Sequence, residues 1–172
     1  MISRLLAVML LMTSCATYHL ERVYHTQPGL VNMEDAVAFG EKCYVSETGI
    51  PIFQFEAQCP SKKVLDADLF RLFKRLGKED LEPFKTLRIT FVSKNIVCGP
   101  YGKDDNLEVH GCSNPATNEI TVRLSGTRAS WSRTTAHEIG HFVILWDFPE
   151  SHGDPGHIAV PVWHLIEAID DE

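Results

Sequence analysis

Hydrophobic residues recur with helical spacing in the segment SKKVLDADLFRLFKRLGKED, residues 61–80. The spacing is seen at Val64, Leu65, Leu69, Leu72, Phe73 and Leu76. They lie on one side of a helix with 3.6 residues per turn. Gly77 suits the end of this helix, because glycine readily adopts the left-handed conformation that closes many helices. The pattern therefore predicts a helix that packs one side on a core and ends near Gly77.

Alternating patterns predict strands elsewhere in the chain. LRITFVS, residues 87–93, alternates apolar and polar positions, which is typical of a half-buried strand. IPIFQFEA (50–57) and EITVRLS (119–125) are predicted strands as well. The turn-rich segment 95–118 is interpreted as a crosslinked hairpin.

Three further helices are expected, over residues 33–42, over about 132–146, and from 162 to the end. A helix and several strands thus precede a long helix. This order predicts an α+β fold with a small mixed sheet. The chain has 172 residues, of which 44% are hydrophobic, enough for one domain with a real core. The net charge of −7 and the lack of a long basic run argue against nucleic acid as a partner.

The N-terminus has the features of an export signal. MISR gives a short basic region, and the next eight residues, LLAVMLLM, are all apolar. Eight residues rise only about 12 Å as a helix, too little for the roughly 30 Å hydrocarbon core of a membrane. Residues 1–14 are therefore predicted to be a signal peptide.

The stretch LLMTSC, which ends at Cys15, resembles the lipobox of bacterial lipoproteins, with Met12 where leucine is usual. The resemblance implies that Cys15 becomes the first mature residue and carries lipid, and that Ala16 after it directs the protein to the outer membrane. Residues 15–32 would be a tether and 33–172 the folded domain. The alternative is an ordinary cleaved signal with an incidental cysteine.

Four cysteines remain in the mature chain: Cys43, Cys59, Cys98 and Cys112. An even number in an exported protein indicates disulfides, and three pairings are possible. We favour Cys43–Cys59 and Cys98–Cys112, because each closes a short local loop. The competing interpretation, a cysteine metal site, lacks a C-x-x-C pair.

The segment AHEIGH contains the pattern H-E-x-x-H in His137, Glu138 and His141. On a helix the two histidines lie one turn apart on one face, where both can bind one zinc ion. Glu138 lies near the same space and could accept a proton from a metal-activated water. A competing interpretation is a capping box, in which Thr135 and Glu138 would only begin the helix.

This segment, which follows a predicted strand, resembles the metzincin zinc peptidases, whose pattern is H-E-x-x-H-x-x-G-x-x-H/D. Without gaps, the third ligand would be Asp147, and Ile144 would replace the glycine. A β-branched residue resists the turn that the glycine permits, so the helix is expected to continue past Ile144. Asp147 would then point away from the metal.

The run SHGDPGHIAVP, residues 151–161, resembles the matrixin-like sequence of histidine, D-P-G and a methionine turn. In that alignment His152 is the third zinc ligand, with His157 as the next candidate. No methionine follows Met33, and Ala159 lies near the position where the family has its methionine. That methionine forms a hydrophobic floor beneath the zinc in the family.

The resemblance implies a zinc metallopeptidase that acts on peptides or proteins, and we expect the protein to be a monomer. Glu138 would be the catalytic base, His137, His141 and His152 would hold Zn²⁺, and the strand 119–125 would form the edge of the substrate cleft. Two alternatives stay open. One is a non-catalytic envelope lipoprotein with a structural zinc site of four ligands, including His157. The other is a metallohydrolase with a non-peptide substrate.

Overall fold

The computed structural model describes residues 29–98, 109–124, 127–153, 156–158 and 160–167. The chain divides into two compact units, Met1–Leu30 and Val31–Glu172, and the second contains nearly all of the described residues. The predicted signal peptide and Cys15 lie outside the described residues. The last residues of the expected tether, Leu30–Asn32, form a strand, β1.

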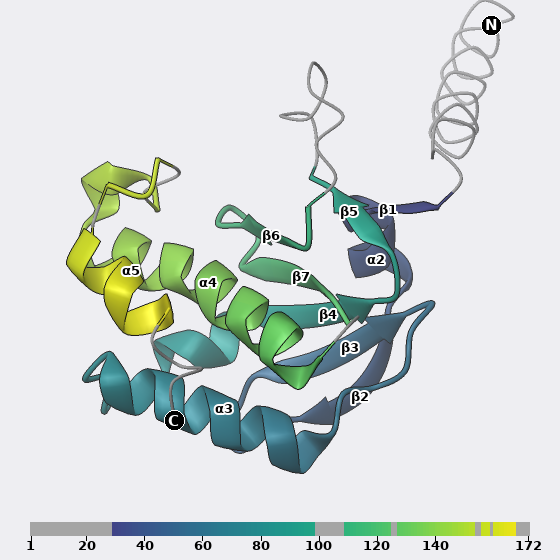
Figure 1. The fold of residues 1–172 in the computed structure, drawn as a ribbon, viewed down its shortest axis with the longest axis horizontal. Coiled ribbons are helices and arrows are strands. Elements are labelled where there is room, and N and C mark those ends of the chain that lie inside the picture. Colours follow the sequence, from purple (N-terminus) through teal and green to yellow (C-terminus); the bar gives the residue numbers. More distant parts are fainter. Residues whose placement is uncertain (1–28, 99–108, 125–126, 154–155, 159, 168–172) are drawn as a thin grey trace, which may run out of the picture. The chain divides into compact units, whose positions relative to one another are not determined.

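A mixed sheet of five strands forms the centre of the domain, in the order β2-β3-β4-β7-β6 (Figure 1). The three central strands, β3, β4 and β7, run parallel, and the two outer strands run antiparallel to their neighbours. A separate two-stranded sheet pairs β1 with β5. The strands are β2 (Glu41–Val45), β3 (Pro51–Phe55), β4 (Arg88–Val92), β5 (Asn95–Val97), β6 (Gly111–Asn114) and β7 (Glu119–Arg123).

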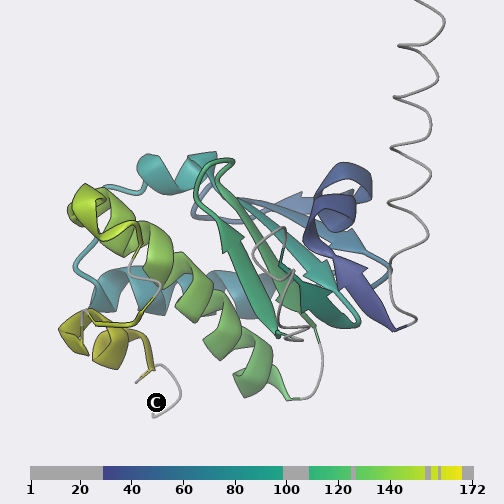
Figure 2. The same ribbon diagram turned by 90° about the horizontal axis from the view of Figure 1, so that it is seen from above.

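Helices cover both faces of the five-stranded sheet (Figures 1 and 2). One face packs Ile89, Phe91, Ile120 and Val122 against two long helices, and this is the larger core. The opposite face packs Val92 and its neighbours against a short helix. The helices are α2 (Met33–Phe39), α3 (Lys62–Arg75), α4 (Arg128–Asp147) and α5 (Val160–Glu167), with short 3₁₀ helices at Pro83–Thr86 and Pro149–Ser151.

The α+β class expected from the sequence is confirmed, and the helix at 61–80 is observed as α3. Gly77 follows it with a φ of +63°, in the left-handed region. The strand β2 was not predicted, and it occupies the end of the predicted helix 33–42. That helix stops at Gly40, where a Cβ atom would lie 2.6 Å from the Ala36 carbonyl oxygen. β2 is an outer strand with mostly exposed residues, so it has no clear alternation.

Both favoured disulfides are present. Cys43 of β2 is bonded to Cys59, which lies shortly before α3. Cys98 follows β5 and is bonded to Cys112 of β6. Each bond spans a short sequence separation, of 16 and 14 residues. The crosslinks thus hold the two outer strands of the sheet to neighbouring segments.

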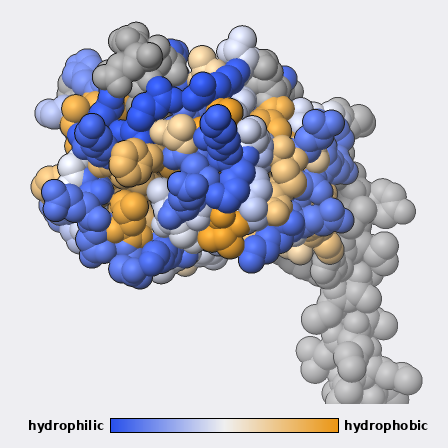
Figure 3. Space-filling view, turned by 90° about the horizontal axis from the view of Figure 1, so that it is seen from below, coloured by the Kyte–Doolittle hydropathy of each residue, from blue (hydrophilic) through white to orange (hydrophobic). Residues whose placement is uncertain are grey.

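The surface seen from the side of α3 mixes hydrophilic residues with separate hydrophobic spots (Figure 3). Phe70 of α3 is one of the large hydrophobic residues that stay exposed. Among the described residues, no helix is long and apolar enough to cross a membrane.

Candidate metal centre

The helix α4 carries His137, Glu138 and His141 in its middle. It begins after Thr127, earlier than the predicted start near residue 132. The capping-box interpretation is therefore wrong. Thr135 lies well inside the helix, and its hydroxyl donates a hydrogen bond to the Trp131 carbonyl oxygen, one turn earlier.

The helix continues through Ile144, as expected from its β-branched side chain, and ends at Asp147. Ile144 is 1% exposed, so it also belongs to the core. Asp147 pairs with Lys78, 2.6 Å from the ammonium nitrogen. The structure thus places Asp147 in an ion pair outside the histidine cluster, which agrees with its exclusion as a ligand.

Three histidines form a cluster that could hold a metal ion. The ring centroids of His137 and His141 lie 5.0 Å apart. His157 lies 4.8 Å from the first and 5.2 Å from the second. One ring nitrogen from each can be chosen so that all three lie within 4.8 Å of one another. Tetrahedral zinc with Zn–N bonds of about 2.0–2.1 Å needs nitrogens roughly 3.3 Å apart, so modest side-chain rotation would complete the site.

The third member of this cluster is His157 and not His152, which the sequence alignment favoured. His152 is exposed and has a φ of 53° at the end of the 3₁₀ helix after α4. Gly153 follows with a φ of +80°, so the chain turns here before it reaches the cluster. Four residues separate the two histidines, so sequence spacing alone does not show which of them joins the cluster.

The same turn fixes the proton of His141. Its Nδ1 atom lies 2.7 Å from the Gly153 carbonyl oxygen, which can only accept a hydrogen bond. Nδ1 must therefore carry the proton, and Nε2 keeps its lone pair for a metal. A Cβ atom on Gly153 would lie 3.0 Å from the His141 carbonyl oxygen, so a larger residue would crowd this approach.

His137 is also held in the form that binds metals. Burial, together with the nearby His141 and His157 rings, lowers its pKa to about 4. At neutral pH His137 is therefore uncharged and offers a lone pair. Three neutral imidazoles are donors of the kind that zinc prefers, so the residues present fit this metal.

Glu138 points away from solvent toward the outer strand β6. Its side chain is buried, and burial raises its pKa to about 7. A hydrogen bond from the Ser113 hydroxyl opposes this rise by stabilising the carboxylate. A carboxyl group with a pKa near the working pH can both accept and return a proton.

The outer strand beside Glu138 is β6, and not the strand 119–125 that we expected to form the cleft edge. β7 occupies that segment, but it lies between β4 and β6 and so has no free edge. Gly111 of β6 contacts Glu138 closely, because a Cβ atom there would lie 2.5 Å from Oε1. The sequence does not show that β6 is the outer strand, because β6 is short and lies within the segment predicted to be a hairpin.

Sequence reasoning also missed Trp163 of α5. Its ring centroid lies 4.9 Å from that of His137, 4.8 Å from that of His141 and 4.7 Å from that of His157. Trp163 is 6% exposed. One indole therefore contacts all three imidazoles of the cluster. The sequence gives only a weak indication that Trp163 packs inward, because Trp163 lies on the apolar side of the predicted final helix together with Ile166.

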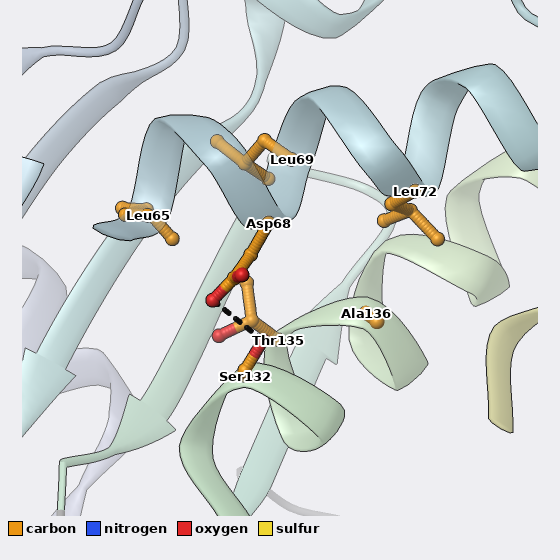
Figure 4. A pocket seen from close by; sticks show the side chains of 7 residues that line it. All are labelled: Leu65, Asp68, Leu69, Leu72, Ser132, Thr135 and Ala136. Carbon is orange, nitrogen blue, oxygen red and sulfur yellow. Dashed lines mark hydrogen bonds between the residues drawn. The ribbon is translucent and has the colours of Figure 1, made fainter. Parts of the chain in front are cut away.

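A buried carboxylate fixes the first half of α4 against α3. Asp68 of α3 points to Ser132 of α4, whose hydroxyl donates a 2.8 Å hydrogen bond (Figure 4). Arg128 and Arg71 also donate to Asp68. Burial alone would raise the pKa of Asp68, but these three donors outweigh it and lower the pKa. The contacts of Arg128 and Ser132 with Asp68 thus anchor the helix that carries the histidines.

The chain was compared with protein families, curated proteins and solved structures, and none of them matches it.

Proposed function

We propose that this protein is a zinc-dependent peptidase. The observation that carries the proposal is the grouping of His137, His141 and His157 beside the buried Glu138. Three protein ligands leave a fourth position for water or substrate, as in catalytic zinc sites. The H-E-x-x-H pattern and its resemblance to the metzincins support the same reaction.

Each residue has a defined part in this reaction. Bound at the three histidines, zinc would polarise the substrate carbonyl and lower the pKa of a water molecule to about 7. Glu138 accepts a proton from the attacking water and later donates it to the leaving amine nitrogen. The Gly153 carbonyl keeps His141 in the tautomer that leaves Nε2 free.

The strand β6 is the proposed substrate-binding edge. It is an outer strand of the five-stranded sheet and lies next to Glu138 through Gly111 and Ser113. An extended peptide could add to such an edge through backbone hydrogen bonds. This geometry favours peptides or proteins over small substrates.

The alternative of a structural zinc site has less support. That hypothesis requires a fourth protein ligand, and His152 was the expected one. Among the described residues, the candidate metal cluster contains His137, His141 and His157 only. A buried carboxyl group next to the cluster is also unnecessary for a purely structural site.

Hydrolysis of a denatured protein tests the proposed function. The Glu138→Gln variant should lose about 10²–10⁴-fold in kcat while it still binds zinc, because only the proton carrier is changed. Glu79→Gln is the matched control, since Glu79 is exposed. Full activity in Glu138→Gln would refute the assigned base.

We further propose that the protein is exported, anchored to the cell envelope by lipid on Cys15, and monomeric. The two disulfides support an oxidising compartment. On the face drawn in Figure 3 the hydrophobic spots are separate, which supports a monomer for that face. Metabolic labelling with a fatty acid, lost in Cys15→Ala, would test the anchor. Sedimentation of the purified protein would test the monomer.

A further inference from the structure

Trp163 occupies an unusual position among the rings of the metal centre. The centroid distances from its indole to His137, His141 and His157 span only 4.7–4.9 Å. The indole is tilted by 30° to the first ring and by 65° and 82° to the other two. These are the stacked and edge-to-face arrangements that aromatic rings prefer. One side chain therefore restricts the rotation of all three proposed ligands.

The helix α5 reaches this position because α4 has a glycine there. A Cβ atom on Gly140 would lie 2.2 Å from Ile166 Cδ1 and 2.9 Å from Trp163 Cζ3. Both α5 residues are buried against α4. Gly140 normally weakens a helix relative to alanine, so its presence here is explained by the close packing of Trp163.

We propose that Trp163 is a positioning residue of the metal centre, an inference that rests on the metal site of the proposed function. Its indole holds the three imidazoles in the arrangement that binds zinc and closes one side of the site to water. The face of the indole also carries negative electrostatic potential. It thus favours the imidazoles when they share the charge of a bound cation over the same rings without metal.

Zinc affinity gives the first test, measured on the purified full-length chain by competition with a chromogenic chelator. Trp163→Leu should weaken zinc binding by about 10–100-fold, the usual cost of losing a residue that orients metal ligands. Trp163→Phe keeps an aromatic ring and should restore part of the affinity. Gly140→Ala should also weaken binding, although alanine favours helices.

Trp146 supplies the matched control. It lies on α4 and packs against Phe84 and Phe142, and its side chain is half-buried. Trp146→Leu removes an indole from the same core but should leave zinc affinity within about twofold, because no contact of Trp146 with the three histidines is observed among the described residues.

Tryptophan fluorescence gives a second readout that does not depend on activity. Co²⁺ should quench part of the emission of the wild-type chain, because Trp163 touches all three ligands. Trp163→Phe should lose this quenched fraction, and Trp146→Phe should retain it. If Trp163→Leu does not fold, the zinc affinity of Trp163→Phe tests the positioning role, and the quenching tests that Trp163 lies beside the bound metal.

Two results would overturn the proposal. One is a folded Trp163→Leu variant, checked by circular dichroism, that binds zinc as tightly as the wild type or more tightly. The other is undiminished Co²⁺ quenching in Trp163→Phe. The protein could also bind zinc, lose affinity in Trp163→Leu, and cleave no peptide. That result would support the positioning role of Trp163 and refute the proposed peptidase function.

Discussion

At the scale of single residues, the site depends on contacts that are specific to each side chain. His141 has one ring nitrogen fixed by a backbone carbonyl, and burial keeps His137 neutral. Gly111 leaves the space that the Glu138 carboxyl group occupies. The two helix histidines and Glu138 could be chosen from their spacing. His157, Gly111 and Trp163 could not, because their roles come from contacts between distant segments.

The choice between His157 and His152 leads to the first prediction at this scale. His157→Ala removes a proposed ligand. Its zinc affinity should therefore fall by more than the roughly 10–100-fold that follows the loss of a residue that only orients the ligands. His152→Ala should bind zinc like the wild type, since His152 is exposed and lies outside the cluster. Zinc titration of both variants checks this. The reverse order of affinities would restore His152 as the third ligand.

Gly111 gives a second prediction. In Gly111→Ala the new Cβ atom would overlap Glu138 Oε1 and must displace the carboxyl group. A shift of about 1 Å in a reacting group can cost 10²-fold, so kcat should fall on that order while zinc binding persists. Gly77→Ala is the control, because it has open space but a left-handed φ. It should cost about 1 kcal/mol in stability and no activity.

At the scale of elements, the position of α4 matters most. β6 lies against its Glu138 side, α5 lies against its Gly140 side, and α3 holds its first half through Asp68. These three contacts come from segments on both sides of α4 in the sequence. The length of α4 followed partly from the pattern, but its earlier start did not. Residues 128–131 carry little periodic signal, and Trp131 is buried in the larger core, where its ring contacts Phe91.

The Asp68 contact predicts how stability depends on pH. Its pKa in the folded protein is lower than in the unfolded chain, so the unfolded state takes up a proton first as the pH falls. Asp68 therefore stabilises the fold at neutral pH, and this contribution is lost as the pH falls below about 4. Asp68→Asn should cost about 1–3 kcal/mol at pH 7, because hydrogen bonds to a charged group are lost.

Urea unfolding of the wild type and Asp68→Asn from pH 7 to pH 3 measures this effect. The difference in unfolding free energy should shrink at the acid end of the range. Glu79→Gln provides the matched control, because Glu79 is exposed and its replacement should change little at any pH. A difference that stays constant with pH would show that Asp68 acts only through its shape.

At the scale of the whole molecule, a large apolar core supports the candidate metal cluster. The larger core is built from apolar residues of the sheet, α3, α4 and α5. Two disulfides also constrain the chain independently of any metal. The fold should therefore survive the loss of the metal.

Removal of the metal tests this independence. A chelator should abolish hydrolysis, while the circular dichroism spectrum stays unchanged. The thermal midpoint should fall only by the amount expected when a bound ligand is withdrawn. Added Zn²⁺ should restore activity. Unfolding on chelation would instead indicate the structural zinc site of the alternative hypothesis.

The sequence by itself determined the features that depend on neighbours along the chain. It predicted the α+β class, the period of α3, the continuation of α4 through Ile144, and the two local disulfides. It also predicted that His137 and His141 share one face, because helical spacing requires it.

Only the tertiary structure decided which segments meet. It placed His157 beside His137 and His141, the strand order made β6 an edge, and the packing of α5 on Gly140 placed Trp163. Each of these depends on the path of a loop or on strand pairing between distant residues. Such contacts leave no period in the sequence, because their geometry is set by the packing of the whole core.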